Sequence, residues 1–388
     1  MRSNWIRFLA GVLVSVALVG AFAVTGGMKG GRSTNGLLYQ ASGLHPDGEM
    51  LAISGQTVTC EEYLFWLGMV CDNVTASLPD VDWSAAVTGD GMTFAEYAKT
   101  DAVEAAKQHA VVRAWAQQAG VALSDASTLE LDAQRQQYVA YYGSEEAYLQ
   151  QLALMGISEE AYDRILEDQY LYRDLYQAFC TPGSSLYADD ATLTDYAAQL
   201  GYMGAYVLKL TGDNAETMAN DLLERWQAAE DKEKEYALIC EELQQTADGI
   251  VTLTAVEDDA LSDAMSALEI GGMTAVIDPY GEGTSFVVLR TEPDLSAVAE
   301  TYFDVLWNQK MEEATVVTNS KLYDGVDVGA FYEKLIQLRQ DMMAEMDGGA
   351  QTDDDQTGGS QSDSTDDSAD DSADDSADSA ADDPQPAA

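Results

Sequence analysis

The stretch Leu261–Glu292 decides the fold of the C-terminal half of this chain: LSDAMSALEIGGMTAVIDPYGEGTSFVVLRTE. It opens with apolar residues at helical spacing, and a Gly-Gly pair at 271–272 ends the predicted helix. An apolar run at 273–277, a Gly-rich turn and a second apolar run at 285–291 then predict two strands. A helix followed by two strands joined by a tight turn indicates a small α+β unit.

The preceding residues extend this unit. An apolar run at 203–210 predicts a strand, and residues 211–230 and 232–246 have helical spacing. A short strand at 249–254 and a helix at 258–268 complete the order. This order, together with the run TSFVVLRTE that ends at Glu292, resembles a parvulin-type (PpiC-type) peptidyl-prolyl isomerase domain. The resemblance implies a domain over 187–293 with a small, mostly antiparallel sheet.

Parvulins hold proline in an apolar pocket beside two histidines on adjacent strands, and the resemblance places those histidines at Tyr206 and Phe286. The chain has only two histidines, His45 and His109, and both lie outside the unit. We therefore predict no catalytic residue and a degenerate domain. Cys240 falls at an alanine position of the family and is not predicted to be a catalytic thiol.

The pocket of the family is also altered. The positions that line the proline pocket correspond to Glu257 and Leu261, so one wall carries a carboxylate. We expect Tyr206 and Phe286 to be packing partners on neighbouring strands, or an aromatic pair that holds an extended apolar peptide. The candidate peptide-binding residues are Tyr206, Leu261 and Phe286.

Residues 49–186 predict a different, helical domain. Thr59 with Glu62, and Thr93 with Glu96, have the spacing of capping boxes at helix starts. Ser124, Ser144 and Ser158 follow as further helix starts, and glycines at 120, 143 and 156 as helix ends. The runs at 50–67 and 148–176 resemble the N-terminal domains of PrsA/SurA-type extracytoplasmic foldases, which implies a chaperone-like domain.

Two further helices are predicted within 294–346. In the foldase family this part of the chain returns to pack on the N-terminal helices. The resemblance therefore implies a mainly α fold: a discontinuous helical domain with the α+β unit inserted into it.

The ends of the chain indicate its location. Arg2 and Arg7 precede an apolar run at 8–24, which predicts a signal anchor or a cleavable signal peptide within 1–25. Residues 26–48 are Gly-rich and are expected to be a spacer. We expect a cell-membrane protein with its folded part outside the cytoplasm, or a secreted protein if the signal is cleaved. Residues 347–388 are rich in Asp, Ser and Ala, the composition of a disordered acidic tail.

Composition excludes several classes of ligand. Nineteen Lys and Arg against 68 Asp and Glu give a net charge of −49, which repels nucleic acid and anionic lipid. Four cysteines without a Cys-x-x-Cys or Cys/His cluster predict no metal site, and nothing in the sequence predicts a cofactor. Cys60 and Cys71 lie on one predicted helix, about 16 Å apart at 1.5 Å per residue, too far for a disulfide.

The leading hypothesis is a membrane-anchored extracytoplasmic foldase or chaperone whose partners are unfolded or newly translocated proteins. Two alternatives stay open. One is an active peptidyl-prolyl isomerase that works without the histidines. The other is a non-catalytic scaffold of the cell envelope.

Overall fold

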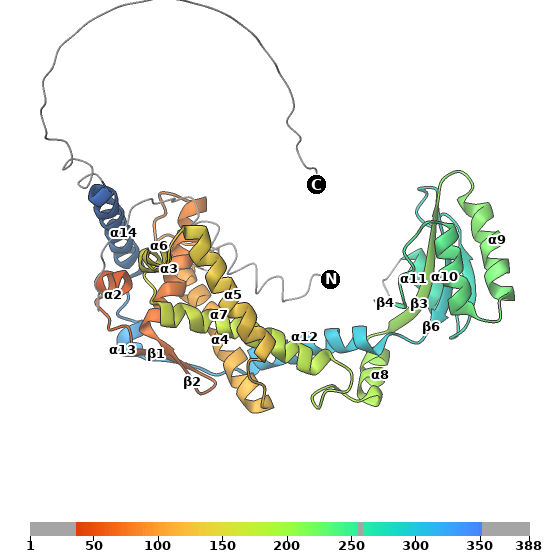
Figure 1. Cartoon of the computed structure of the whole chain (residues 1–388), viewed down its shortest axis with the longest axis horizontal. Coiled ribbons are helices and arrows are strands. Elements are labelled where there is room, and N and C mark those ends of the chain that lie inside the picture. Colours follow the sequence, from red (N-terminus) through yellow and green to blue (C-terminus); the bar gives the residue numbers. More distant parts are fainter. Residues whose placement is uncertain (1–35, 88, 90, 255–258, 351–388) are drawn as a thin grey trace, which may run out of the picture.

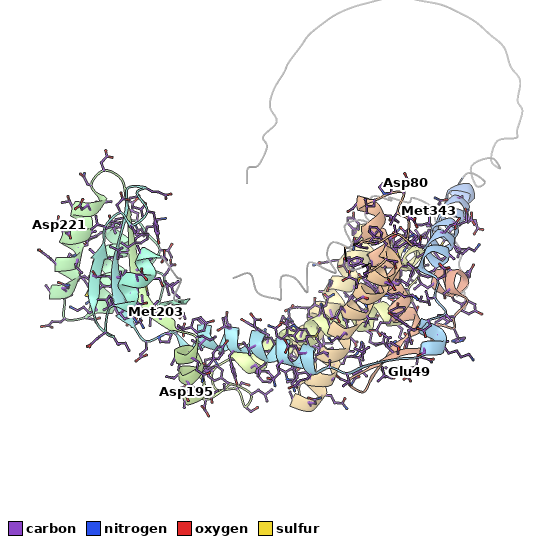
Figure 2. All side chains as sticks on the ribbon, turned by 180° about the vertical axis from the view of Figure 1, so that it is seen from behind. Glu49, Asp80, Asp195, Met203, Asp221 and Met343 are labelled. Atoms are coloured by element: carbon purple, nitrogen blue, oxygen red, sulfur yellow. The ribbon has the colours of Figure 1, made fainter. Side chains whose placement is uncertain are left out.

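The computed structural model describes residues 36–350 apart from 88, 90 and 255–258. The fold is mainly helical with two small antiparallel sheets, which confirms the predicted class. Figure 1 shows two lobes joined by an arm, and Asp221 and Met343 mark opposite ends of the molecule in Figure 2. The apolar run at 8–24, Glu257 and residues 351–388 of the predicted tail lie outside the described residues. The first residues of the predicted tail, 347–350, are the end of a helix that begins at Val328. Within those residues, no helix is long and apolar enough to cross a membrane.

The first lobe, here called the helical body, combines residues from both ends of the described chain. Its elements are α2 (Leu37–Ser42), β1 (Glu49–Ile53), β2 (Gln56–Thr59), α3 (Cys60–Ser77), α4 (Phe94–Ala119), α5 (Asp125–Tyr142), α6 (Glu145–Met155), α7 (Glu159–Cys180), β7 (Val316–Thr318), α13 (Ser320–Tyr323) and α14 (Val328–Ala350).

The predicted caps explain where these helices begin and end. At the starts of α5, α6 and α7, the side chains of Ser124, Ser144 and Ser158 each accept a hydrogen bond from a backbone N–H three residues on. Thr93 and Glu96 form the predicted capping box of α4. Glycines 120, 143 and 156 follow α4, α5 and α6 in left-handed conformation, with φ of 70°, 87° and 86°. Local sequence therefore predicted these boundaries correctly.

The capping box predicted for Thr59 and Glu62 forms only in part. The Thr59 side chain accepts from the backbone N–H of Glu62 as predicted. The Glu62 carboxylate, however, accepts from Arg113 at 3.1 Å instead of turning back to the start of α3. The Glu62 carboxylate, which local sequence assigned to the helix cap, therefore forms an ion pair with Arg113 instead.

The segment expected to be a spacer contributes to the core in its described part. Leu37 and Leu38 of α2 are buried, and α2 packs against α14. The left-handed Gly156 brings its Cα against Leu38, where a Cβ would lie 2.7 Å from the leucine side chain. Residues 36–48 are therefore part of the helical body.

The chain after the α+β unit returns to the first helices. β7 pairs antiparallel with β1, with Leu51 opposite Thr318, in a sheet of order β2-β1-β7. Arg339 of α14 donates two hydrogen bonds to the Asp72 carboxylate of α3 and one to the backbone oxygen of Leu154. Neither β7 nor β2 was predicted, because each is too short to show a period of two.

Residues 202–291 form the second lobe (Figure 1) and are called the α+β unit from here on. Residues 187–201, at the start of the predicted range 187–293, lie in the arm, where the helix Asp190–Gln199 packs on residues 298–299. Its antiparallel sheet has the order β4-β3-β6-β5. The elements are β3 (Tyr202–Thr211), α9 (Ala215–Ala228), α10 (Lys232–Glu242), β4 (Val251–Thr254), α11 (Ala260–Ser266), β5 (Met273–Val276) and β6 (Thr284–Thr291). The arm consists of the end of α7, α8 (Asp190–Gln199) and α12 (Leu295–Glu313).

Candidate functional site

The register of β3 and β6 decides where the candidate residues point. These central strands are antiparallel, with Tyr206 opposite Leu289 and Lys209 opposite Phe286. Side chains of directly paired residues lie on the same face, and the face alternates at each residue along a strand. Tyr206 is three residues from Lys209, so Tyr206 and Phe286 lie on opposite faces of the sheet.

The prediction that Tyr206 and Phe286 form an aromatic pair on neighbouring strands is therefore wrong. Tyr206 belongs to the apolar cluster under α9 and α10, whereas Phe286 belongs to the cluster under α11. The β3 residue near Phe286 on its own face is Val207. The observed register differs by one residue from a pairing that would put Tyr206 and Phe286 on one face, and a shift of one residue moves every side chain of a strand to the other face.

The face that carries Phe286, here called the α11 face, brings two of the three candidates together. Leu261 of α11 is partly buried against the same cluster as Phe286. Val207, Leu253 and Ala264 are also only partly buried there, so apolar side chains remain accessible to a ligand.

The turn between β5 and β6 borders the α11 face. The Tyr280 ring meets Phe286 edge-on, with centroids 6.3 Å apart. Its hydroxyl donates a 2.6 Å hydrogen bond to Asp259, which also caps α11 by accepting from the backbone N–H of Ser262. The Asp259 hydrogen bond raises the pKa of the tyrosine hydroxyl. Tyr280 is half exposed and was not among the candidate residues.

Tyr206 lies in a closed environment. Its ring contacts Tyr236, which in turn stacks on the fully buried Trp226 of α9. Burial, followed by the nearby Glu233 carboxylate, raises the pKa of the Tyr206 hydroxyl. Because α9 and α10 cover this face, Tyr206 is a core residue rather than part of an open binding surface.

The α11 face offers apolar contact and little acid–base chemistry. Both histidines of the chain, His45 and His109, lie in the helical body. Cys240 is buried under the opposite face, and burial raises the pKa of its thiol. Ser285 is buried, and its hydroxyl accepts from the backbone N–H of Asp278. In the part of the chain that the structure describes, no three His, Cys, Asp or Glu side chains gather as a metal site.

The helical body contains a buried polar cluster that the sequence did not reveal. Asp168 of α7 lies 3.1 Å from His109 Nδ1 and accepts a 2.8 Å hydrogen bond from Arg113. The same guanidinium donates to Glu62 of α3 at 3.1 Å. Trp66 stacks on the His109 ring with centroids 5.1 Å apart.

This cluster joins three helices through charge. Burial opposes the charge of Arg113, but Asp168 and Glu62 outweigh that effect and raise the pKa of the guanidinium. His109 and Arg113 share one face of α4 because they are four residues apart. Their partners lie more than 50 residues away along the chain, so no local signal identified them.

No protein-family model and no curated protein matches this chain. Among solved structures it is similar to the foldase PrsA of Lactococcus lactis, with 12% identity over 74% of this chain and 99% of that one, and a TM-score of 0.28. PrsA of Bacillus subtilis is 18% identical over 67% and 93%, with a TM-score of 0.25. PrsA of Streptococcus pneumoniae is 15% identical over 66% and 97%, with a TM-score of 0.23. TM-scores this low transfer neither site nor activity to this chain.

Proposed function

We propose that this chain is an extracytoplasmic foldase-like chaperone, held at the membrane by residues 1–25, that binds unfolded or newly translocated proteins. The single observation that carries the proposal is the α11 face. At the position of a family histidine it has Phe286, which is 9% exposed. The cluster around Phe286 is bordered by four apolar side chains that are only partly buried: Val207, Leu253, Leu261 and Ala264. Such a face suits an extended apolar peptide and lacks the histidine pair of the isomerase family.

The charge of the molecule supports the same role. A net charge of −49 keeps copies of the chain apart while apolar surface stays accessible, as a protein that handles aggregating clients requires. The two lobes on one arm also offer an unfolded client more than one surface (Figure 1).

An aggregation assay tests the chaperone role. The purified chain should lower the light scattering of a reduced, unfolding client at near-stoichiometric ratios. Phe286→Ser with Leu261→Ser should weaken that effect. The matched control is Tyr206→Ser with Leu222→Ser, which replaces one buried and one partly buried residue on the opposite face of the sheet. Unchanged scattering with the unmodified chain would refute the role.

A protease-coupled assay of an X-Pro peptide tests the loss of catalysis. The uncatalysed barrier is about 18–20 kcal/mol. We expect the rate with the chain present to equal the rate in buffer. A rate that rises in proportion to protein concentration, and falls with Phe286→Ser, would instead favour an isomerase.

A further inference from the structure

A pocket of about 400 Å³ lies in the arm, away from the α11 face. The end of α7, the segment before α8, α8 itself and one side of α12 enclose it. Figure 1 shows α8 and α12 between the two lobes, and Figure 2 marks Asp195 of α8 close to Met203, where the α+β unit begins. The volume of this pocket is near the lower end of the range for small-ligand sites, roughly 300–1,000 Å³. It therefore suits one or two side chains rather than a folded partner.

The lining of this arm pocket is mostly apolar and aromatic. Phe303 is fully buried, and Phe179, Leu186, Tyr187 and Tyr302 are partly buried around it. Aromatic rings offer apolar contact and a face that attracts cations.

The surroundings of the arm pocket are predominantly acidic, and the first lysine of α12, Lys310, lies one turn beyond the lining residue Leu306. Residues 179–200 and 294–309 contain six carboxylates and no lysine or arginine. The six are Asp189, Asp190, Asp195, Asp294, Glu300 and Asp304. Asp189 lines the pocket itself, and a hydrogen bond from the backbone N–H of Thr192 lowers the pKa of its carboxyl, so it is ionised at neutral pH.

Burial and, after it, the neighbouring carboxylates raise the pKa of two titratable groups in the arm. Burial, then Asp190 and Asp294, raise the pKa of Tyr187. Burial, then Glu300 and Asp304, raise the pKa of Cys180 to about 12. A positive charge brought to the arm would face carboxylates from both α8 and α12.

We propose that the arm pocket binds an unfolded client segment in which an apolar side chain is flanked by lysine or arginine. The apolar side chain enters the pocket, and the flanking cations meet the carboxylates of α8 and α12. This inference rests on the proposed chaperone function and adds to it a substrate class and a second binding surface. The chain's own Asp-rich tail does not fit, since it is acidic and contains no large apolar residue.

Fluorescence anisotropy with short labelled peptides tests the substrate class on the full chain. The probe is a flexible peptide with a central Leu-Trp pair and two lysines on each side. Two matched peptides replace the lysines with glutamates, or the Leu-Trp pair with Gly-Ser. We expect the lysine peptide to bind at least about tenfold more tightly than either at low salt, and to weaken at 0.5 M salt because charges are then screened. Equal binding of the glutamate peptide would overturn the inference.

Substitutions on α8 test the location. Thr192→Trp places a large ring in the pocket and leaves the backbone N–H that Asp189 caps. Thr194→Trp, exposed on the same helix and outside the lining, is its control. The first should weaken the lysine peptide at least about tenfold, and the second should leave it unchanged. Equal affinities for the two variants would overturn the assignment.

The charge contribution has its own pair of variants. Asp190→Asn with Glu300→Gln should weaken the lysine peptide severalfold at low salt and have little effect at 0.5 M. Asp221→Asn with Glu216→Gln, on the surface of α9, is the control of equal net charge. If both pairs of substitutions weaken binding equally, the carboxylates of the arm do not bind the lysines of the peptide, and the inference is overturned.

The aggregation assay separates the two proposals when Thr192→Trp and Thr194→Trp are run beside the unmodified chain. If the unmodified chain does not suppress aggregation, the chaperone function fails. If it does, and Thr192→Trp suppresses a cationic client equally well, only the arm pocket is refuted. Selective loss with Thr192→Trp supports both.

Discussion

Removal of Arg113 tests how far the buried polar cluster holds the helical body together. The guanidinium is 16% exposed, whereas the side chains of Glu62 and Asp168 are 5% and 3% exposed. Arg113→Met keeps most of the volume of the side chain and leaves two carboxylates in the interior without their shared cation. Such a loss is more costly than replacement of the whole cluster by apolar groups.

The magnitude follows from the contacts. Arg113 donates one hydrogen bond to Asp168 and one to Glu62, each to a charged acceptor and each worth about 1.5–3 kcal/mol. The sum, about 3–6 kcal/mol, agrees with the roughly 3–5 kcal/mol lost when one partner of a buried pair is removed. Arg113→Lys keeps the charge, but a single ammonium lacks the fork that reaches both carboxylates, so we expect about half of that loss.

Amide hydrogen exchange followed by mass spectrometry provides the assay. Peptides from α3, α4 and α7 should exchange about two to three and a half powers of ten faster in Arg113→Met, since each 1.4 kcal/mol is a factor of ten. Peptides from β3 and β6 belong to the other lobe and should not change. Those strands therefore serve as an internal reference in the same sample.

A matched control and a rescue variant make the result decisive. Arg164 of α7 lies on the surface, 3.8 Å from Glu160, and Arg164→Met should cost less than about 0.5 kcal/mol. Adding Glu62→Gln and Asp168→Asn to Arg113→Met removes the uncompensated charges and should recover at least half of the loss. If Arg113→Met and Arg164→Met behave alike, the cluster does not stabilise the body and the reasoning is refuted.

Three further predictions follow from other contacts. Gly204→Ala should destabilise the α+β unit by about 1–3 kcal/mol or more, because the new Cβ would lie 2.0 Å from the backbone oxygen of Glu292; Gly249→Ala meets open space and should be neutral in urea unfolding. The Cys180 thiol, with its pKa raised to about 12, should be roughly one part in ten thousand thiolate at pH 8, so its alkylation should accelerate tenfold per pH unit up to pH 10; a plateau near pH 9 would contradict this. Burial and then Glu300 raise the pKa of Asp304 above 3.8, so its charge opposes folding at neutral pH and not at acid pH; Asp304→Asn should therefore raise the unfolding midpoint at pH 7, and the gain should vanish as the pH falls toward 3.8. A gain that is the same at both pH values would contradict the last prediction.

Helix boundaries were predicted well because their causes are local. A serine or threonine hydroxyl reaches a backbone N–H three residues ahead, and a glycine adopts the left-handed conformation without strain, whatever the rest of the chain does. The exception at Glu62 has a tertiary cause, since Arg113 offers its carboxylate a charged partner in a buried site.

The candidate site was predicted only in part. Of the three peptide-binding candidates, Phe286 and Leu261 lie in one cluster, whereas Tyr206 lies on the other face of the sheet; their role in binding stays a prediction. β3 was predicted as a strand, but both of its faces carry apolar residues between 203 and 208, so periodicity alone did not fix its register against β6. Only the pairing of Lys209 with Phe286 fixes it.

By itself, the sequence determined the order of the long helices and of the strands in the α+β unit, the acidic charge and the absence of a histidine pair from that unit. Each of these depends on residue identity or on contacts within a few residues. The tertiary structure alone decided which face Phe286 occupies, that β7 pairs with β1, that Asp168 and Glu62 share Arg113, and that α7, α8 and α12 enclose a pocket. These features join residues far apart along the chain, and the interactions that select them exist only after the chain has folded.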